Sequence, residues 1–355
     1  MKGLILSGGK GTRLRPLTYT SAKQLVPIAN KPVLFYGIEA IAEAGIRDIG
    51  IVVGDTQAEI RAAVGDGSRW GVRVTYIEQD APRGLAHAVK ISQGFIGSDP
   101  FVMYLGDNLL NKGISQFVQD FVREAPAAQI LLARVPDPQM FGVAELRNGK
   151  VVRLVEKPKE PIGDLALVGV YMFGPQVFES VNRIKPSFRN ELEITDAIQD
   201  LIDQGLTVRP QIVEGWWKDT GKLEDMLEAN RLILETFDRR VDGQVDAESR
   251  VEGKVVIEAG AVVERSVIRG PAIIGNGARI IQAYVGPYTS IMNDVVIQDT
   301  EIEHSIVLEC SSLRDLANRV TDSLIGKNVR IYRIPVKPSA YRFMLGDNSE
   351  VGIRW

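Results

Sequence analysis

The chain has 355 residues, 45% of them hydrophobic, and a formal net charge of −3. This length and apolar content allow a sizeable core and favour two domains. The charge provides no broad basic field, which argues against nucleic acid as a partner. The single cysteine, Cys310, excludes an intrachain disulfide and fits a reducing compartment.

The N-terminal run Met1 to Leu6 is too short for a signal sequence or a membrane span. We therefore expect a cytoplasmic protein with no membrane partner. The rest of the first two-thirds alternates between strand and helix patterns. The expected strands are residues 4–6, 49–53, 72–77 and 101–105, and the expected helices are residues 33–44, 59–64 and 85–93.

This βαβ order predicts an α/β, Rossmann-like domain with a mostly parallel sheet and helices on both faces. Ligands of such sheets bind beyond the carboxyl ends of the strands. Residues 7–13 and 106–108 directly follow two of the expected strands. They are therefore site candidates on topology alone.

After about residue 240 the helical spacing disappears and β-branched residues recur every five or six positions. The recurring residues are Val251, Ile257, Val262, Ile268, Ile274, Ile280, Val285, Ile291, Ile297, Ile302 and Val307. Such a repeat, with small residues at the corners, is typical of a parallel β-helix whose rungs bury their apolar edges by stacking. A meander or sandwich is the alternative, but its turns usually come every 8–12 residues or so.

The change in pattern predicts four segments along the chain. They are the α/β domain at 1–238, a linker at 239–250, a left-handed parallel β-helix at 251–335 and a tail at 336–355. The β-branched faces of the rungs and the ends of the coil could be covered by another subunit of the same protein, so we expect a homo-oligomer.

The strongest local signal follows the first strand, in the run Ser7-Gly8-Gly9-Lys10-Gly11-Thr12-Arg13-Leu14-Arg15-Pro16-Leu17-Thr18. Glycines let backbone N–H groups approach a phosphate, and an arginine can bind its oxygens with two parallel hydrogen bonds. The spacing is neither a Walker loop nor the dinucleotide fingerprint. A generic glycine turn is the alternative, which Arg13 disfavours.

These residues resemble a known family, the glucose-1-phosphate thymidylyltransferases. The resemblance rests on the glycine run and on later motifs in the same order: Lys23-Gln24-Leu25, Gln79 with Pro82 and Gly84-Leu85-Ala86, Gly106-Asp107-Asn108, Phe141-Gly142-Val143, Glu156-Lys157-Pro158, Glu191 to Asp196, and Trp217 with Asp219-Thr220-Gly221. The repeat at the C-terminal end is similar to the long form of this family. The resemblance implies transfer of a thymidylyl group from dTTP to glucose 1-phosphate, with Mg²⁺ as cofactor.

The resemblance also implies roles for individual residues. The nucleotide would contact Gly8, Gly9, Gly11, Thr12, Arg13, Gln24, Gln79, Pro82, Gly84 and Asp107. The sugar phosphate would contact Gly142, Glu156, Lys157, Leu167 and Trp217. The catalytic cations would be Arg13, Lys23 and Lys157, and the metal ligands Asp107 and Asp219. Short-form members commonly have Tyr where this chain has Phe141, so one hydroxyl contact is absent here.

The chemistry explains this residue inventory independently. A phosphate monoester has its second pKa near about 6 and is mostly dianionic at neutral pH, so it can attack without a general base. Catalysis then requires in-line positioning and neutralisation of charge by Arg, Lys and Mg²⁺. Each residue considered alone also has a structural explanation: Asp107 could be a helix cap, and Trp217 could be a packing group.

Three other functions stay open. The first is a sugar-nucleotide pyrophosphorylase that uses UTP, or GTP with mannose 1-phosphate; Gln24, where guanylyltransferases commonly have Pro, favours thymidylyl transfer. The second is a hexapeptide-repeat acyltransferase, for which His304 is the candidate base in the coil. The third is a non-catalytic sugar-nucleotide sensor, which the retained cations and carboxylates disfavour.

Overall fold

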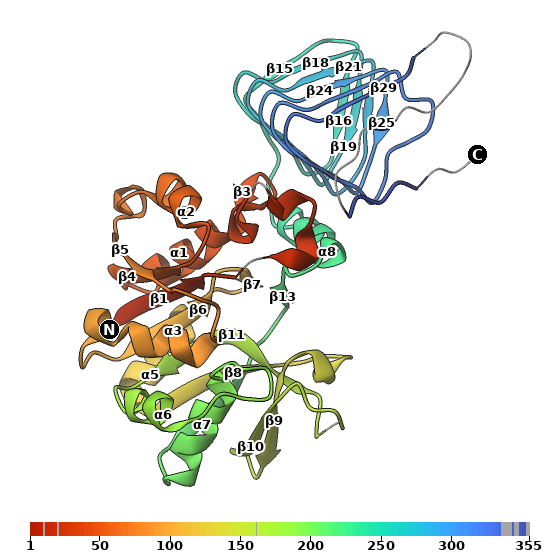
Figure 1. The fold of residues 1–355 in the computed structure, drawn as a ribbon. Helices are drawn as coiled ribbons and strands as arrows, with labels where there is room; N and C mark the ends of the chain where they lie inside the picture. Colours follow the sequence, from red (N-terminus) through yellow and green to blue (C-terminus); the bar gives the residue numbers. More distant parts are fainter. Residues whose placement is uncertain (10, 20, 161, 335–342, 344–347, 353–355) are drawn as a thin grey trace. The chain divides into compact units, whose positions relative to one another are not determined.

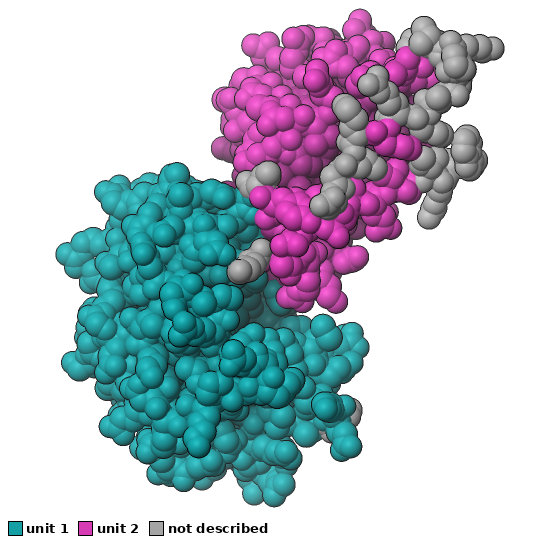
Figure 2. All heavy atoms as spheres, in the orientation of Figure 1, with its two compact units in different colours: residues 1–10, 21–25, 33–219 teal, residues 11–20, 26–32, 220–355 magenta. Residues whose placement is uncertain are grey.

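The computed structural model describes the whole chain except residues 10, 20, 161, 335–342, 344–347 and 353–355. The chain divides into two compact units (Figure 2). Unit 1 contains residues 1–10, 21–25 and 33–219, and unit 2 contains residues 11–20, 26–32 and 220–355. Most of the predicted tail at 336–355 lies outside the described residues.

Unit 1 is built on a nine-stranded sheet with the central order β10-β9-β11-β6-β1-β4-β5, to which β8 and β12 are added beside β11 (Figure 1). Its strands are β1 (Lys2–Ser7), β4 (Asp48–Val53), β5 (Arg73–Glu78), β6 (Phe101–Leu105), β8 (Ala128–Arg134), β9 (Gly142–Arg147), β10 (Lys150–Glu156), β11 (Leu165–Phe173) and β12 (Val208–Ile212). Strands β5, β4, β1 and β6 are parallel neighbours, whereas β11 runs antiparallel to β6 and β8. The predicted Rossmann-like class is confirmed.

Helices cover both faces of this sheet because its strands alternate between two apolar clusters. The helices of unit 1 are α1 (Val33–Glu43), α2 (Gln57–Val64), α3 (Leu85–Ile91), α4 (Gln93–Ile96), α5 (Ser115–Glu124), α6 (Val177–Arg183) and α7 (Ile194–Asp203). On β1, Leu4 and Leu6 face the cluster that holds α3, α6 and α7, whereas Ile5 faces the cluster that holds α1, α2 and α5. Each such buried side chain contributes about 1.5–3 kcal/mol.

One predicted helix is divided in the structure. The pattern predicts a single helix over 85–93, but α3 ends at Ile91 and α4 begins at Gln93. The buried Ser92 between them donates its hydroxyl to the carbonyl of Ala88 at 2.7 Å. A serine hydroxyl that competes for the backbone in this way interrupts a helix. Among the described residues, no helix has the length and apolar content needed to cross a membrane.

Unit 2 contains three stacks of short parallel strands in the arrangement of a left-handed β-helix, which confirms that prediction (Figure 1). Stack one is β14 (Arg240–Val241), β17 (Val255–Ile257), β20 (Ala272–Ile274), β23 (Thr289–Ile291), β26 (Ile306–Val307) and β28 (Leu324–Ile325). Stack two is β15 (Gln244–Val245), β18 (Val262–Glu264), β21 (Arg279–Ile281), β24 (Val296–Gln298), β27 (Ser312–Arg314) and β29 (Arg330–Tyr332). Stack three is β16 (Arg250–Glu252), β19 (Val267–Arg269), β22 (Tyr284–Val285) and β25 (Glu301–Ile302).

The apolar repeat forms the columns inside this coil. In stack one, Ile257, Ile274 and Ile291 lie directly over one another and are fully buried. The sequence repeat is wrong by one position in stack two, where Val263 rather than Val262 lies in the column and is buried. Two adjacent valines carry no signal as to which one faces inward, so only the strand pairing decides it.

The coil also begins earlier than the sequence pattern indicates. Strands β14, β15 and β16 fall within the segment 239–250 or at its end, which the pattern predicts to be a linker. An end rung packs against a neighbour on one side only, so it needs fewer apolar residues and resembles a loop. Val245 and Val251 are its partly buried contacts with the core of the coil.

A single buried amide joins three segments of unit 2. The segments are α8 (Leu223–Leu234), the hairpin of β2 (Pro27–Ile28) with β3 (Lys31–Pro32), and the coil. Asn230 of α8 accepts from the backbone N–H of Ala29 at 2.9 Å and from the hydroxyl of Ser290 at 2.6 Å. It donates to the carbonyl of Tyr288 at 3.0 Å and is fully buried. The amide of this one residue therefore ties the early hairpin to the β-helix.

We expect Asn230→Ala to destabilise unit 2, because it leaves a buried N–H, hydroxyl and carbonyl without their partner. The expected loss is about 1–3 kcal/mol for each buried polar group that stays unsatisfied. Urea denaturation followed by circular dichroism measures it as a lower midpoint. Asn182→Ala, at an exposed position of α6, is the control and should leave the midpoint unchanged. An unchanged midpoint in Asn230→Ala would show that the amide is dispensable.

Candidate active site

Two of the predicted site segments leave the sheet of unit 1 side by side. Strands β1 and β6 are parallel neighbours in which Leu6 stands opposite Leu105. The backbone N–H of Gly106 donates to the carbonyl of Leu6 at 3.0 Å, which continues the pairing past the strand end. The chain therefore enters both the glycine run and the Asp107 turn at the same carboxyl edge of the sheet.

Asp107 lies at this edge in an ion pair with Lys23, which comes from the short 3₁₀ turn η3 (Lys23–Leu25). Both side chains are largely buried, with 13% of Asp107 and 16% of Lys23 exposed. Burial alone would raise the pKa of Asp107, but the Lys23 ammonium and a hydrogen bond from Asn108 hold that pKa below its ordinary value. Asp107 is therefore ionised at neutral pH.

No helix follows Asp107, so it is not a helix cap. The strand β7 (Asn108–Leu110) follows instead and pairs antiparallel with β13 (Trp217–Asp219). In this register Asp219 stands opposite Asn108. Asp107 directly precedes β7 and Asp219 is the last residue of β13, so the pairing brings the two predicted metal ligands to the same end of these strands from distant parts of the chain.

The indole of Trp217 positions the residue next to Asp107. Its Nε1–H donates to the side-chain oxygen of Asn108 at 2.6 Å, and Asn108 in turn donates to Asp107 at 3.0 Å. Phe141 meets the Trp217 ring edge to face, with the ring centroids 5.3 Å apart. Trp217 thus combines a packing role with a polar one.

Glycines at positions 8 and 9 leave room for three side chains. A Cβ added at Gly9 would lie 3.1 Å from Cε of Lys23 and 3.8 Å from the amide nitrogen of Gln24. One added at Gly8 would lie 3.0 Å from the amide oxygen of Gln79. Gln24 is 1% exposed, and its amide oxygen has no hydrogen-bond partner within the described part of the chain. That oxygen is an acceptor available to a ligand.

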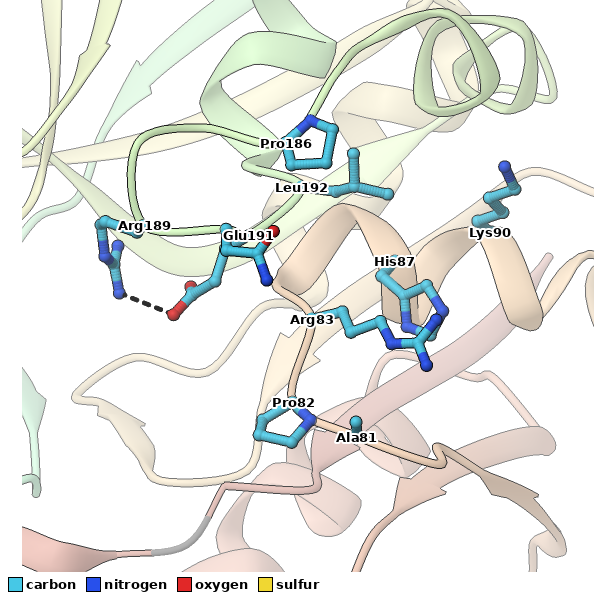
Figure 3. A pocket seen from close by; sticks show the side chains of 10 residues that line it. Ala81, Pro82, Arg83, His87, Lys90, Pro186, Arg189, Glu191 and Leu192 are labelled. Carbon is cyan, nitrogen blue, oxygen red and sulfur yellow. Dashed lines mark hydrogen bonds and ion pairs between the residues drawn. The ribbon is translucent and has the colours of Figure 1, made fainter.

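The segment with Pro82 and Gly84 is clamped to the loop before α7. The backbone N–H of Leu192 donates to the carbonyl of Arg83 at 2.8 Å, and the N–H of Ala86 donates to the carbonyl of Leu192 at 3.0 Å. Gly84 has φ +100° and a Cβ there would collide with the backbone of Leu192, so only glycine fits. An open pocket of about 830 Å³ borders both segments (Figure 3).

A second group of predicted residues gathers on β9, β10 and β11. Strands β9 and β10 place Gly142 opposite Glu156. A Cβ at Gly142 would lie 2.9 Å from Cδ1 of Leu167, 3.1 Å from a carboxylate oxygen of Glu156 and 2.7 Å from Cγ2 of Thr195. The structure thus brings together three of the five residues predicted for the sugar phosphate, with Thr195 of α7 beside them. Lys157 follows with φ +43°, and its N–H donates to the carbonyl of Phe141.

Two cations oppose the effect of burial on the Glu156 carboxylate. Burial raises the pKa of Glu156, and the nearby Glu193 raises it further, whereas Lys157 and Arg189 oppose the shift. Arg189 lies 3.5 Å from Glu156 and 3.1 Å from Glu191. Its side chain lines the open pocket of Figure 3. Arg189 is therefore a cation of this site that the sequence patterns did not single out.

Gly11, Thr12 and Arg13 belong to unit 2. Gly11 has φ +62° and precedes the 3₁₀ turn η1 (Thr12–Leu14), and its carbonyl accepts from the hydroxyl of Thr18 at 2.7 Å. The left-handed backbone at Gly11 explains why this position is a glycine. The predicted contacts of these three residues with phosphate stay predictions.

Comparison with known proteins identifies the family. Residues 2–236 match the model of the nucleotidyl transferase family. The chain belongs to this family. A Streptomyces griseus glucose-1-phosphate thymidylyltransferase is 55% identical over 354 residues, 99% of each chain. The nucleotidyl transferase prediction is thereby confirmed, and the match extends over the coil as well.

Two solved structures are similar to the nucleotidyl transferase unit. One is a Bacillus anthracis protein in complex with a sucrose, named provisionally as a glucose-1-phosphate thymidylyltransferase. It is 36% identical in sequence, and its TM-score is 0.62. The match covers 65% of this chain and 94% of the Bacillus anthracis chain. The other is a UDP-glucose pyrophosphorylase complexed with UDP-glucose, 26% identical with a TM-score of 0.59, covering 66% of this chain and 98% of its own.

Three residues of this nucleotidyl transferase site were not predicted from the sequence: Thr195, Arg189 and His87. Asn108 lies within the predicted segment 106–108, but no role was predicted for it. Thr195 lies inside a motif that carries the resemblance, and Arg189 lies two residues before that motif, so their positions offer a usable signal. His87 had no signal beyond its place on the predicted helix, since only the tertiary structure brings it to Gln79.

We expect Trp217→Phe to lower the free energy of unfolding by about 1–3 kcal/mol, because it keeps the ring against Phe141 but leaves the buried oxygen of Asn108 without a donor. Urea denaturation monitored by circular dichroism measures the loss. Trp70→Phe is the matched control, because Trp70 packs by ring contacts against Phe35 and Arg69. Equal stability changes in the two variants would contradict a special role for the indole N–H.

Proposed function

We propose that this chain is a glucose-1-phosphate thymidylyltransferase that converts dTTP and glucose 1-phosphate to dTDP-glucose and pyrophosphate. The observation that carries the proposal is the buried pair of Lys23 and Asp107 at the joined ends of β1 and β6. A carboxylate and a cation held together at this edge suit a site for a charged phosphate group. The name of the Streptomyces griseus relative supports the same reaction.

The nucleotide is assigned to the side of the site that contains Gly8 and Gly9. Gln79 would read the base, with Pro82 and Gly84 lining its pocket, and the unpaired amide oxygen of Gln24 would accept a hydrogen bond from the nucleotide. Arg13 and Lys23 would neutralise the triphosphate. Backbone N–H groups of a glycine-rich turn and fixed cations are the groups that bind such anions.

The sugar phosphate is assigned to the group on β9, β10 and β11. Glu156 would accept hydrogen bonds from sugar hydroxyls, since Lys157 and Arg189 oppose the rise in its pKa and favour the ionised form. The absence of a side chain at Gly142 lets Leu167 and Glu156 lie close to its backbone, and Gly142, Leu167 and Trp217 would border the sugar. Lys157 would hold the phosphate group.

The reaction needs no nucleophile from the protein. An oxygen of the dianionic sugar phosphate attacks the α-phosphorus of dTTP, and the bond from that phosphorus to the bridging oxygen of the β-phosphate breaks. The electron pair leaves with pyrophosphate. Lys23 and Arg13 would offset the negative charge that gathers on the transferring group, and Lys157 would align the attacking oxygen.

The donor set at this edge fits a magnesium ion. Asp107 directly precedes β7, and Asp219 stands opposite Asn108, the first residue of that strand. Mg²⁺ commonly takes one or two carboxylates with phosphate oxygens and waters. Among the described residues, no cluster of three or more His, Cys, Asp or Glu side chains is arranged to hold a metal ion. Asp107 and Asp219 would hold Mg²⁺, which when bound supplies Lewis-acid neutralisation of phosphate charge.

Other parts of the prediction remain proposals. The homo-oligomer and the cytoplasmic location stay predictions from the sequence. His304, the candidate base of the acyltransferase alternative, lies on the coil beside Asp322 and meets the ring of Tyr288 edge to face. These contacts explain its presence without catalysis.

Steady-state kinetics of the full chain test the proposed function. With glucose 1-phosphate and Mg²⁺ we expect release of pyrophosphate and the highest kcat/KM with dTTP. UTP has the same hydrogen-bonding edge as dTTP and is the informative competitor. A higher kcat/KM with UTP would reassign the chain to the UTP-dependent enzymes. Acyl transfer from an acyl-CoA, or nucleotide binding without turnover of any triphosphate, would contradict the proposal.

We expect Asp107→Asn and Asp219→Asn each to lower turnover about a hundredfold or more, because asparagine can still accept hydrogen bonds but is a poor Mg²⁺ ligand. The measurement is the rate of pyrophosphate release at several Mg²⁺ concentrations, with partial rescue by Mn²⁺. Circular dichroism should show an intact fold.

Asp48→Asn is the matched control for both variants. Asp48 begins β4 at the opposite end of the same sheet and pairs with Arg73 at the surface. Its turnover and Mg²⁺ dependence should match those of the unaltered chain. Normal turnover in Asp107→Asn or Asp219→Asn would remove that residue from the metal site.

A further inference from the structure

His87 of α3 contacts the residue assigned to the nucleobase. Its Nδ1 lies 3.0 Å from the amide nitrogen of Gln79. An amide nitrogen has only hydrogens to offer, so Nδ1 must accept, and the imidazole is neutral with its proton on Nε2. The amide oxygen of Gln79 is turned the other way, toward Gly8, where an added Cβ would meet it at 3.0 Å.

We propose that His87 is a positioning residue, which fixes the amide of Gln79 in one orientation and thereby selects a thymine or uracil base over cytosine. The inference rests on the proposed function, in which Gln79 reads the base. It adds a specificity role for a residue to which the proposed function assigns no contact with substrate.

The selection follows from the hydrogen-bonding edges of the bases. Thymine and uracil present an N3–H donor next to the O4 acceptor, whereas cytosine presents an N3 acceptor next to an amino donor. A freely rotating amide can match either edge by turning over. An amide whose nitrogen is bound to His87 offers its oxygen to N3–H and its second N–H to a carbonyl, which fits thymine and uracil but not cytosine.

Protonation of His87 would reverse this arrangement. An imidazolium Nδ1–H is a donor, so it would require the oxygen of Gln79 and turn the amide over. Burial lowers the pKa of His87 below its ordinary value of about 6.5, and Arg83 and Lys90 lower it further, whereas Asp80 opposes them. His87 is therefore neutral at physiological pH.

The charges around His87 come from three segments. Arg83 pairs with Asp80 at 2.6 Å in the segment before α3, and Lys90 stands one turn further along the same helix. Arg189 and Glu191 border the same open pocket from the loop before α7 (Figure 3). Burial, Asp80, Arg83 and Lys90 shift the pKa of His87 and so set the pH at which selection is lost, on the acid side of the usual histidine range.

The test is the ratio of kcat/KM for dTTP to kcat/KM for dCTP, measured from about pH 5 to about pH 8. The two nucleotides carry the same triphosphate, so titration of phosphate, glucose 1-phosphate and metal ligands cancels in the ratio. We expect a constant ratio at neutral pH and a fall as the pH drops through the pKa of His87. Calorimetric affinities of the full chain for dTTP and dCTP give the same comparison without turnover.

Two variants of His87 test whether its hydrogen-bond acceptor, rather than its size, orients the amide of Gln79. His87→Leu removes the acceptor and should lower the ratio at neutral pH at least about tenfold, with no pH dependence left. His87→Asn retains an acceptor that does not titrate, so its ratio should stay high down to acid pH. The ratio of dTTP to UTP should be unchanged in both, because those bases share one edge. His304→Asn replaces the other histidine of the chain and should behave as the unaltered protein.

The outcomes are distinct. A wild-type ratio and pH profile in His87→Leu, or a ratio that rises at acid pH, would overturn the inference and leave thymidylyl transfer intact. Failure of the unaltered chain to bind or turn over dTTP at any pH would overturn the proposed function and the inference together.

Discussion

Because Leu6 stands beside Leu105 in the parallel pair of β1 and β6, the glycine run and the Asp107 turn leave the sheet at one edge. Lys23 and Asp219, two of the groups assigned to chemistry in unit 1, come close to the Asp107 turn at that edge. Lys23 can reach Asp107 only because both strands end together, and β7 then carries the chain to its pairing with β13 and Asp219. The architecture of the sheet thus supplies a site before any particular side chain is considered.

That site contains a buried ion pair, which needs further hydrogen bonds and a rigid scaffold from the rest of unit 1. Removing an ion pair from water carries a desolvation cost that the mutual attraction offsets only with good geometry and further hydrogen bonds. Asn108 supplies such a bond to Asp107, and Trp217 holds Asn108. The apolar clusters on the two faces of the sheet stabilise the scaffold that keeps these groups in place.

Polar positioning recurs at two other places in the molecule. Asn230 uses its amide to join the early hairpin, α8 and the coil within unit 2. The β-branched columns of the coil form an apolar core, whose contacts have no direction and do not select one partner segment over another. The Gln79 amide is held by His87 in unit 1. In both cases a buried or half-buried amide has one orientation because its donors and acceptors are matched.

The sequence by itself determined the α/β class, the β-helix and the nucleotidyl transferase family, because hydrophobic periodicity and glycine-rich turns are local properties of the chain. It also located most candidate site residues, since each stands in a recognisable motif. Only the tertiary structure decided that Val263 rather than Val262 faces the coil interior, that the coil begins near Arg240, and that His87 meets Gln79. These depend on strand register, on the one-sided packing of an end rung, and on contacts between a helix and a separate strand end, none of which has a local signature in the chain.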